Sequence, residues 1–299
     1  MNSEGRNIRI LVDSWLSDFA VGDLMERSVK VKLDREKIKT IDAIYISHSH
    51  TDHFDPYTLT QIYRTSDSRF HIPILILPHT LQYLIPLIRE YLGDIEIEVL
   101  FPRKVFSLYG IEIRGHVFPQ STITNEDDVM MLSIENHHEL LFAEIDSIPE
   151  EDDLDTQKQL LGILSKKSYE TILYIASRNE LAGDLPLLDL PAKKRRAFRD
   201  EYIAGRKEEM YFAYQKWEYE EFANFPNIYE IPHLVRGFIG QGIGYPRELS
   251  LDFSQLQIFP LEEIASMESD IARECGYHFP QKALLPGRQY RIEHATIEP

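Results

Sequence analysis

Short apolar runs alternate with helical patterns along the first half of the chain. The runs IRILVD (8–13), AIYIS (43–47) and PILIL (73–77) show little alternation, which is typical of strands buried on both faces. Segments 94–101, 104–118 and 129–145 alternate apolar and polar residues. They predict antiparallel hairpins, with turns at Tyr109-Gly110 and Asn136-His137.

Helical patterns lie between these strands. The segment DPYTLTQIYR (55–64) offers Asp55 as an N-cap and a proline at the first helical position. The segment 80–94 has helical spacing, ends at Gly93 and contains Pro86, which predicts a kink or a late helix start. An amphipathic helix is also expected within 153–168.

The second half is more charged and more aromatic. We expect a helical insertion or lid over residues 186–225, whose aromatic side chains either cover a site or pack on the body of the protein. No internal repeat or low-complexity linker interrupts the chain. Helices and strands therefore mix in a single α/β or α+β domain over residues 1–299.

Composition and charge narrow the function classes. The formal net charge of -17 argues against nucleic acid as a partner, because phosphate binding favours a basic surface. A single cysteine, Cys275, excludes an internal disulfide and is consistent with a reducing compartment. With no secretory signal and no apolar run long enough for a membrane span, we expect a cytoplasmic protein that acts on a small molecule. The sequence says nothing about its oligomeric state.

The strongest chemical signal is the stretch SHSHTDHFDP (47–56). It places three histidines and one aspartate within six residues, directly after a buried strand. In extended backbone His48 and His50 project to the same side and can bind one metal ion. Asp52 and His53 follow where the loop turns, and can face a second ion. Imidazole nitrogen and carboxylate oxygen suit zinc, iron or manganese.

These residues carry a resemblance to a known family. The segment from His48 to His53 is similar to the His-x-His-x-Asp-His signature of the metallo-β-lactamase superfamily. The upstream segment ILVDSWL (10–16) resembles the corresponding upstream segment of superfamily members. The chain looks most similar to the lactonase-like and sialic-acid-hydroxylase-like branch. The resemblance implies a four-layer αββα sandwich with a one- or two-metal site at one edge.

The resemblance also implies further ligands. The superfamily has a histidine near the position of Gln120, a weaker donor, while His116 lies four residues earlier on the same strand face. A metal-bridging carboxylate is expected in LLFAEIDS (140–147), where Asp146 is preferred to Glu144. A last histidine after a proline corresponds to His233.

Three functions remain open. The leading hypothesis is a hydrolase that uses one or two zinc ions to activate water against an ester, lactone, amide or phosphodiester bond, with Asp52 accepting a proton. An iron-dependent oxidoreductase in the same pocket is the alternative, with iron or manganese in place of zinc. Gln120 replaces the expected histidine, and the candidate set is then rich in oxygen donors: Asp52, Asp146, Glu144 and Gln120. The third is a non-catalytic relative that keeps the metal site for structure or binding.

Overall fold

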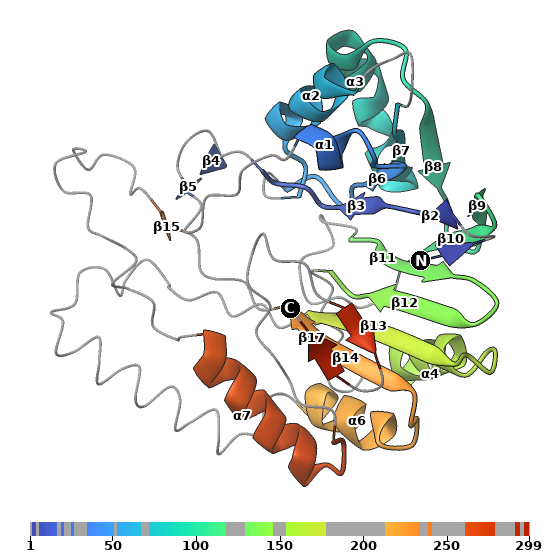
Figure 1. Ribbon diagram of the computed structural model, residues 1–299, viewed down its shortest axis with the longest axis vertical. Coiled ribbons are helices and arrows are strands. Elements are labelled where there is room, and N and C mark those ends of the chain that lie inside the picture. Colours follow the sequence, from blue (N-terminus) through green and yellow to red (C-terminus); the bar gives the residue numbers. More distant parts are fainter. Residues whose placement is uncertain are drawn as a thin grey trace, which may run out of the picture.

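The computed structural model describes most of the chain, in segments separated by gaps (Figure 1). The described residues are 2–3, 6–16, 19–20, 25–26, 35–50, 53–66, 72–117, 129–145, 154–177, 213–233, 239–240, 261–278, 291–293 and 296–298. No helix among them is long and apolar enough to cross a membrane.

The first half forms a four-stranded parallel sheet in the order β3-β6-β7-β8. Its strands are β3 (Ile10–Val12), β6 (Ala43–Tyr45), β7 (Ile74–Pro78) and β8 (Ile97–Leu100). Its helices are α1 (Arg35–Ile38), α2 (Pro56–Thr65), η1 (His79–Leu84) and α3 (Ile85–Leu92). The antiparallel pairing predicted for segment 94–101 is wrong, because β8 runs parallel to β7.

The second sheet has six strands in the order β14-β13-β12-β11-β10-β9. Its strands are β9 (Phe106–Leu108), β10 (Ile111–His116), β11 (Met131–Glu135), β12 (Glu139–Ala143), β13 (Thr171–Ser177) and β14 (Ile228–His233). The predicted hairpins β9–β10 and β11–β12 are confirmed. Strands β12, β13 and β14 run parallel to one another. Its helices are α4 (Leu154–Leu164), α6 (Ala213–Phe222) and α7 (Leu261–Glu274).

Short strands make up the remaining pairs. They are β1 (Asn2–Ser3) with β2 (Arg6–Asn7); β5 (Met25–Glu26) with β4 (Phe19–Ala20) and β15 (Ile239–Gly240); and β16 (Arg291–Glu293) with β17 (Thr296–Glu298).

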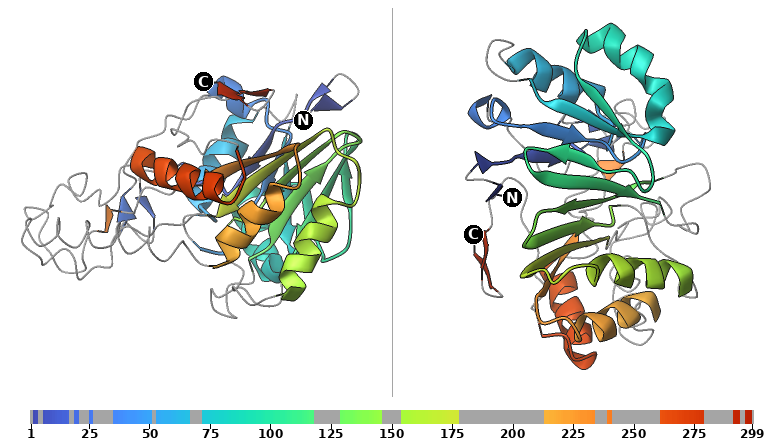
Figure 2. Two further views of the ribbon diagram at one scale, coloured as in Figure 1. Left: turned by 90° about the horizontal axis from the view of Figure 1, so that it is seen from below. Right: turned by 90° about the vertical axis from the view of Figure 1, so that its right-hand side faces the viewer.

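Three apolar clusters show how the layers stack (Figure 2). Ile44 and Leu75 face the helices of the first half, with Leu59 and Ile88. The next residues along these strands, Tyr45 and Ile76, face the second sheet. They form an inter-sheet core with residues of that sheet, among them Met130 and Ile113. The outer face of the second sheet packs against its own helices, in a cluster that includes Phe142, Tyr174, Leu160, Phe222 and Ile271. The expected αββα sandwich is therefore confirmed.

Local signals set the helix ends as expected. The carboxylate of Asp55 accepts the backbone N–H of Tyr57 at 3.1 Å and caps α2. Pro86 lies in the first turn of α3, so it marks a late start rather than a kink. Gly93 ends α3 with a φ of 81°, a conformation that glycine adopts without strain.

Helix α6 belongs to the range predicted as an insertion or lid. Tyr219 and Phe222 are fully buried in the core beneath it, so this helix packs on the outer face of the second sheet. Residues 186–212 lie outside the described part of the chain, and the insertion as a whole stays a prediction.

Gly115 of β10 leaves room for the side chain of Met130, which directly precedes the neighbouring strand β11 of the same sheet. A Cβ atom at this position would lie 2.0 Å from the Sδ of Met130, which is fully buried between the sheets. The backbone oxygen of Met130 in turn accepts the hydroxyl of Tyr45 at 2.5 Å. Burial raises the pKa of Tyr45 well above its usual value, so this hydroxyl stays a donor. Gly115 thus accommodates the side chain of the residue whose backbone oxygen is bonded to Tyr45 of the first sheet.

We expect Gly115→Ala to lower the free energy of unfolding by about 1–3 kcal/mol, because the added methyl group overpacks a filled core. Gly162→Ala is the matched control. A Cβ there meets nothing within 4 Å inside α4, so it should raise stability by about 0.5–1 kcal/mol. Urea unfolding measures both changes, and equal effects of the two substitutions would contradict the packing described here.

Candidate metal centre

The three histidines of the 47–56 stretch lie together at the end of β6. The ring centroids of His48 and His50 are 4.5 Å apart, and those of His48 and His53 are 4.1 Å apart. His48 and His53 are buried, at 2% and 7% exposure, whereas His50 is exposed. The backbone oxygen of His50 accepts the N–H of His53 at 3.0 Å and of Phe54 at 2.7 Å, which closes the loop.

A carboxylate from the neighbouring strand holds this loop. Asp13 follows β3, which pairs in parallel with β6. Its carboxylate accepts the backbone N–H and the hydroxyl of Ser47, both at 2.7 Å. Its Oδ2 also lies 3.2 Å from Nδ1 of His53. Further along, the backbone N–H of Leu16 donates to the hydroxyl of Thr58 in α2 at 2.8 Å.

These contacts set the tautomer of His48 and favour the same tautomer in His53. Ser47 Oγ lies 2.8 Å from Nδ1 of His48 and gives its only hydrogen to Asp13. It must therefore accept a hydrogen from Nδ1 of His48. The carboxylate beside His53 likewise favours a proton on Nδ1 of that ring. In the neutral form of each ring the lone pair then lies on Nε2, the arrangement found in metal-binding histidines whose other nitrogen donates to an oxygen.

The donor chemistry fits a divalent metal ion, but the described residues supply only part of a site. Among them, no three histidine, cysteine, aspartate or glutamate side chains are already gathered as a complete ligand group. The carboxylate candidates Asp52 and Asp146, and also Gln120, lie outside the described residues. For these three positions the assigned roles stay predictions.

Strand order brings the ends of β12 and β14 to the edge of the sandwich at which Ser47 lies. The backbone N–H of Met130, just before β11, lies 3.5 Å from the oxygen of Ser47 and donates to it. The start of β11 lies beside the end of β12, where Leu132 pairs with Ala143. Parallel strands β12, β13 and β14 all end here, and His233 closes β14 opposite Ser177. The side chain of His233 lies outside the described part.

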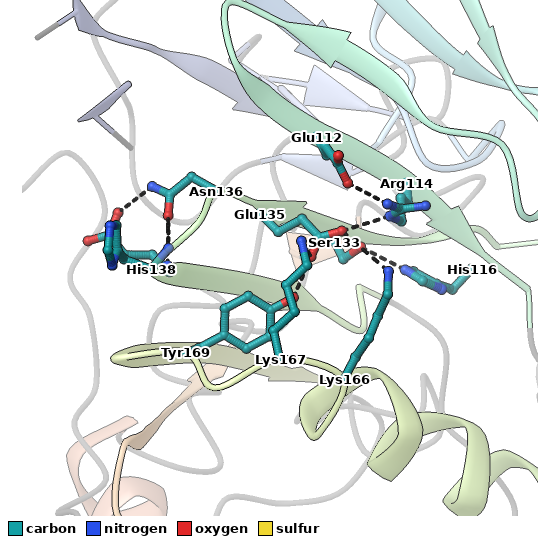
Figure 3. A network of polar contacts seen from close by, with 11 residues as sticks. Glu112, Arg114, His116, Ser133, Glu135, Asn136, His138, Lys166, Lys167 and Tyr169 are labelled. Carbon is teal, nitrogen blue, oxygen red and sulfur yellow. Dashed lines mark hydrogen bonds and ion pairs between the residues drawn. The ribbon is translucent and has the colours of Figure 1, made fainter. Parts of the chain in front are cut away.

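His116 and Glu144, the two alternative candidates, face the outer helices instead. His116 Nε2 lies 2.7 Å from the hydroxyl of Ser133 (Figure 3). Its ring also packs against Phe142. Burial, followed by the charge of Arg114, lowers the pKa of His116 to about 4, so the ring is neutral at pH 7. Glu144 is buried and accepts the hydroxyl of Tyr174 at 2.5 Å.

Asp13 and Ser47 are the residues of this region that sequence reasoning did not assign. Both lie directly after apolar runs, which is a signal for the carboxyl ends of buried strands. Asp13 also has a φ of 44°, a sparsely populated conformation for a residue other than glycine.

No family model and no curated protein matches the sequence. Several solved structures are similar to it. CmlA, a diiron β-hydroxylase from Streptomyces venezuelae, is 13% identical over 56% of this chain and 30% of that protein, with a TM-score of 0.38. The metallo-β-lactamase fold protein YhfI from Bacillus subtilis is 13% identical over 48% of this chain and 53% of that protein, with a TM-score of 0.33.

A diphosphatase of the PhnP family is 20% identical over 48% of this chain and 51% of that protein, with a TM-score of 0.32. The matched part of the chain thus spans about a third to a half of these three proteins. Overlaps of this size do not identify a substrate or a reaction.

Proposed function

We propose that this chain is a metal-dependent hydrolase of small molecules, with its metal held at the carboxyl ends of β6, β12 and β14. The observation that supports it most is the contact of Asp13 with the histidine cluster. That contact favours the tautomers in which Nε2 of His48 and of His53 carries the lone pair. These two nitrogens can then bind a metal ion together with His50.

In this proposal His48, His50 and His53 hold the metal, together with Asp52, Asp146 and His233. Zinc is the first candidate, as one or two ions, because imidazole and carboxylate donors suit it. A bound ion of this kind lowers the pKa of water and polarises the oxygen of the bond to be cleaved. Asp52 orients the attacking water and accepts its proton. Asp13 and Ser47 keep His48 and His53 in the tautomer whose lone pair lies on Nε2.

Elemental analysis of the purified protein beside His50→Ala and Asp52→Ala tests this function. We expect one or two equivalents of zinc in the wild type, a loss of at least one equivalent in each variant, and hydrolysis of ester, lactone or phosphodiester substrates that the variants lack. His138→Ala is the matched control, because that exposed histidine contacts Glu170 at the opposite end of β12 from the proposed site.

Other results would point elsewhere. Tightly bound iron would favour the oxidoreductase alternative, and manganese would exclude zinc as the resident ion. Metal-free wild-type protein with an intact fold would contradict the proposal and favour a non-catalytic relative.

A further inference from the structure

The end of β12, just before the candidate ligand Asp146, has a strained backbone. Ile145 has a φ of 61°, in the left-handed region. A β-branched side chain is disfavoured there, because its Cβ crowds the backbone. Such strain persists only where the surrounding structure holds it, and it is concentrated at functional sites.

Contacts on both faces of the sheet hold this strained position. The backbone N–H of Glu144 donates to the oxygen of Ile175 at 3.0 Å, which keeps the end of β12 on β13. The side chain of Ile145, 7% exposed, packs in the core between the sheets. The side chain of Glu144, 1% exposed, points to the other face and accepts the hydroxyl of Tyr174.

Tyr174 connects this strand end to helix α6. Its hydroxyl lies 2.5 Å from Glu144 and 2.7 Å from Oε1 of Glu218, a fully buried residue of α6. A phenol has one hydrogen and can also accept one, so its hydroxyl can contact both acids. The Tyr174 ring stacks on Phe142 of β12 and meets Phe222 edge-on, so it has little freedom to turn.

We propose that Glu144 and Tyr174 are positioning residues: they hold the left-handed backbone at Ile145, the residue directly before Asp146 in the sequence. The inference rests on the proposed function, in which Asp146 binds metal. Glu144 then acts through the backbone and is not itself a ligand. A glutamine at this position keeps the size and the hydrogen-bonding capacity of the side chain, whereas alanine removes the connection to Tyr174.

Metal affinity shows whether Glu144 positions the strand end or binds the metal directly. Zinc affinities of the wild type, Tyr174→Phe, Glu144→Ala and Glu144→Gln are measured by chelator competition, and cobalt absorption spectra report the ligand geometry. We expect Tyr174→Phe and Glu144→Ala to weaken at least one ion about 10- to 100-fold and to alter the cobalt spectrum. Glu144→Gln should stay within about threefold of the wild type and keep its spectrum.

Tyr277→Phe is the matched control. It removes another buried hydroxyl from the same outer core, one that donates to the oxygen of Ile228 and accepts the backbone N–H of Glu230 in the first half of β14. Urea unfolding of the metal-free proteins shows whether Tyr174→Phe and Tyr277→Phe are equally folded. Loss of metal in Glu144→Gln as large as in Glu144→Ala would overturn the inference, because Glu144 would then be a ligand.

Wild-type affinity and spectrum in Tyr174→Phe would also overturn the inference, while leaving the proposed function in place. Wild-type protein that binds neither zinc nor cobalt would overturn both.

Discussion

Asp13→Asn is expected to weaken zinc binding about 10- to 100-fold, the usual effect of removing a residue that orients metal-binding histidines. The carboxylate of Asp13 faces three donor positions: the N–H and hydroxyl of Ser47, and Nδ1 of His53. An amide has only one acceptor oxygen, so its NH₂ group would face at least one of these donors. His48 and His53 would then lose the contacts that hold their lone pairs on Nε2.

Asparagine suits this test because it tolerates a left-handed backbone, which Asp13 adopts with a φ of 44°. The substitution therefore changes the side-chain chemistry with little change in backbone strain. Chelator competition at constant pH measures the affinity, and circular dichroism confirms the fold.

The matched control is Asp42→Asn. Asp42 is buried at the opposite end of the same sheet, where its Oδ2 accepts the backbone N–H of Arg9 at 2.9 Å. An amide oxygen can also accept this N–H, and Asp42 lies away from the histidine cluster, so metal affinity should not change. Wild-type affinity in Asp13→Asn, or an equal loss in Asp42→Asn, would contradict the role given to Asp13.

The sequence was most informative where function and fold depend on neighbours along the chain. Strands β3, β6 and β7, the cap at Asp55, the helix end at Gly93 and the turn at Tyr109-Gly110 all follow from local patterns. The histidine cluster was also visible, because its members lie within six residues.

Features that depend on distant contacts were not predictable. Asp13 meets Ser47 only because β3 pairs with β6, 34 residues later. The alternation in segment 94–101 suggested an antiparallel strand, but it arises because β8 is a partly exposed edge strand of a parallel sheet. Spacing alone could not show that His116 and Glu144 face the outer helices, because either face of a strand is compatible with the same alternation.

Glu135 illustrates a buried charge that no local pattern reveals. It is 3% exposed at the end of β11, where it accepts Nε of Arg114 at 2.8 Å and Nζ of Lys167 at 3.1 Å (Figure 3). The hydroxyl of Tyr169 also donates to it, and Nζ of Lys166 lies 3.8 Å away. These partners join β10 and the loop after α4 to β11. Burial alone would raise the pKa of Glu135, but its partners outweigh burial and lower it to about 2.

Glu135→Gln is expected to lower the free energy of unfolding at pH 7 by about 1–3 kcal/mol, because the buried carboxylate is the shared counter-charge of the partly buried Arg114 and of two more exposed lysines. Glu112→Gln is the control. Its carboxylate also contacts Arg114, but its side chain is 43% exposed, so the loss should be below about 1 kcal/mol. Urea unfolding of both variants measures the difference, and equal losses would contradict a special role for Glu135.

The pH dependence gives a second check on Glu135. Its pKa is about 2 in the folded protein against an ordinary value of 4.5, so the unfolded chain binds a proton first as the pH falls. The stability that Glu135 contributes is therefore complete above about pH 4.5 and is lost as the pH falls towards 2. The difference between wild type and Glu135→Gln should stay constant from pH 7 to 5 and then shrink. A difference that persists unchanged to pH 2 would show that it comes from the shape of the side chain and not from its charge.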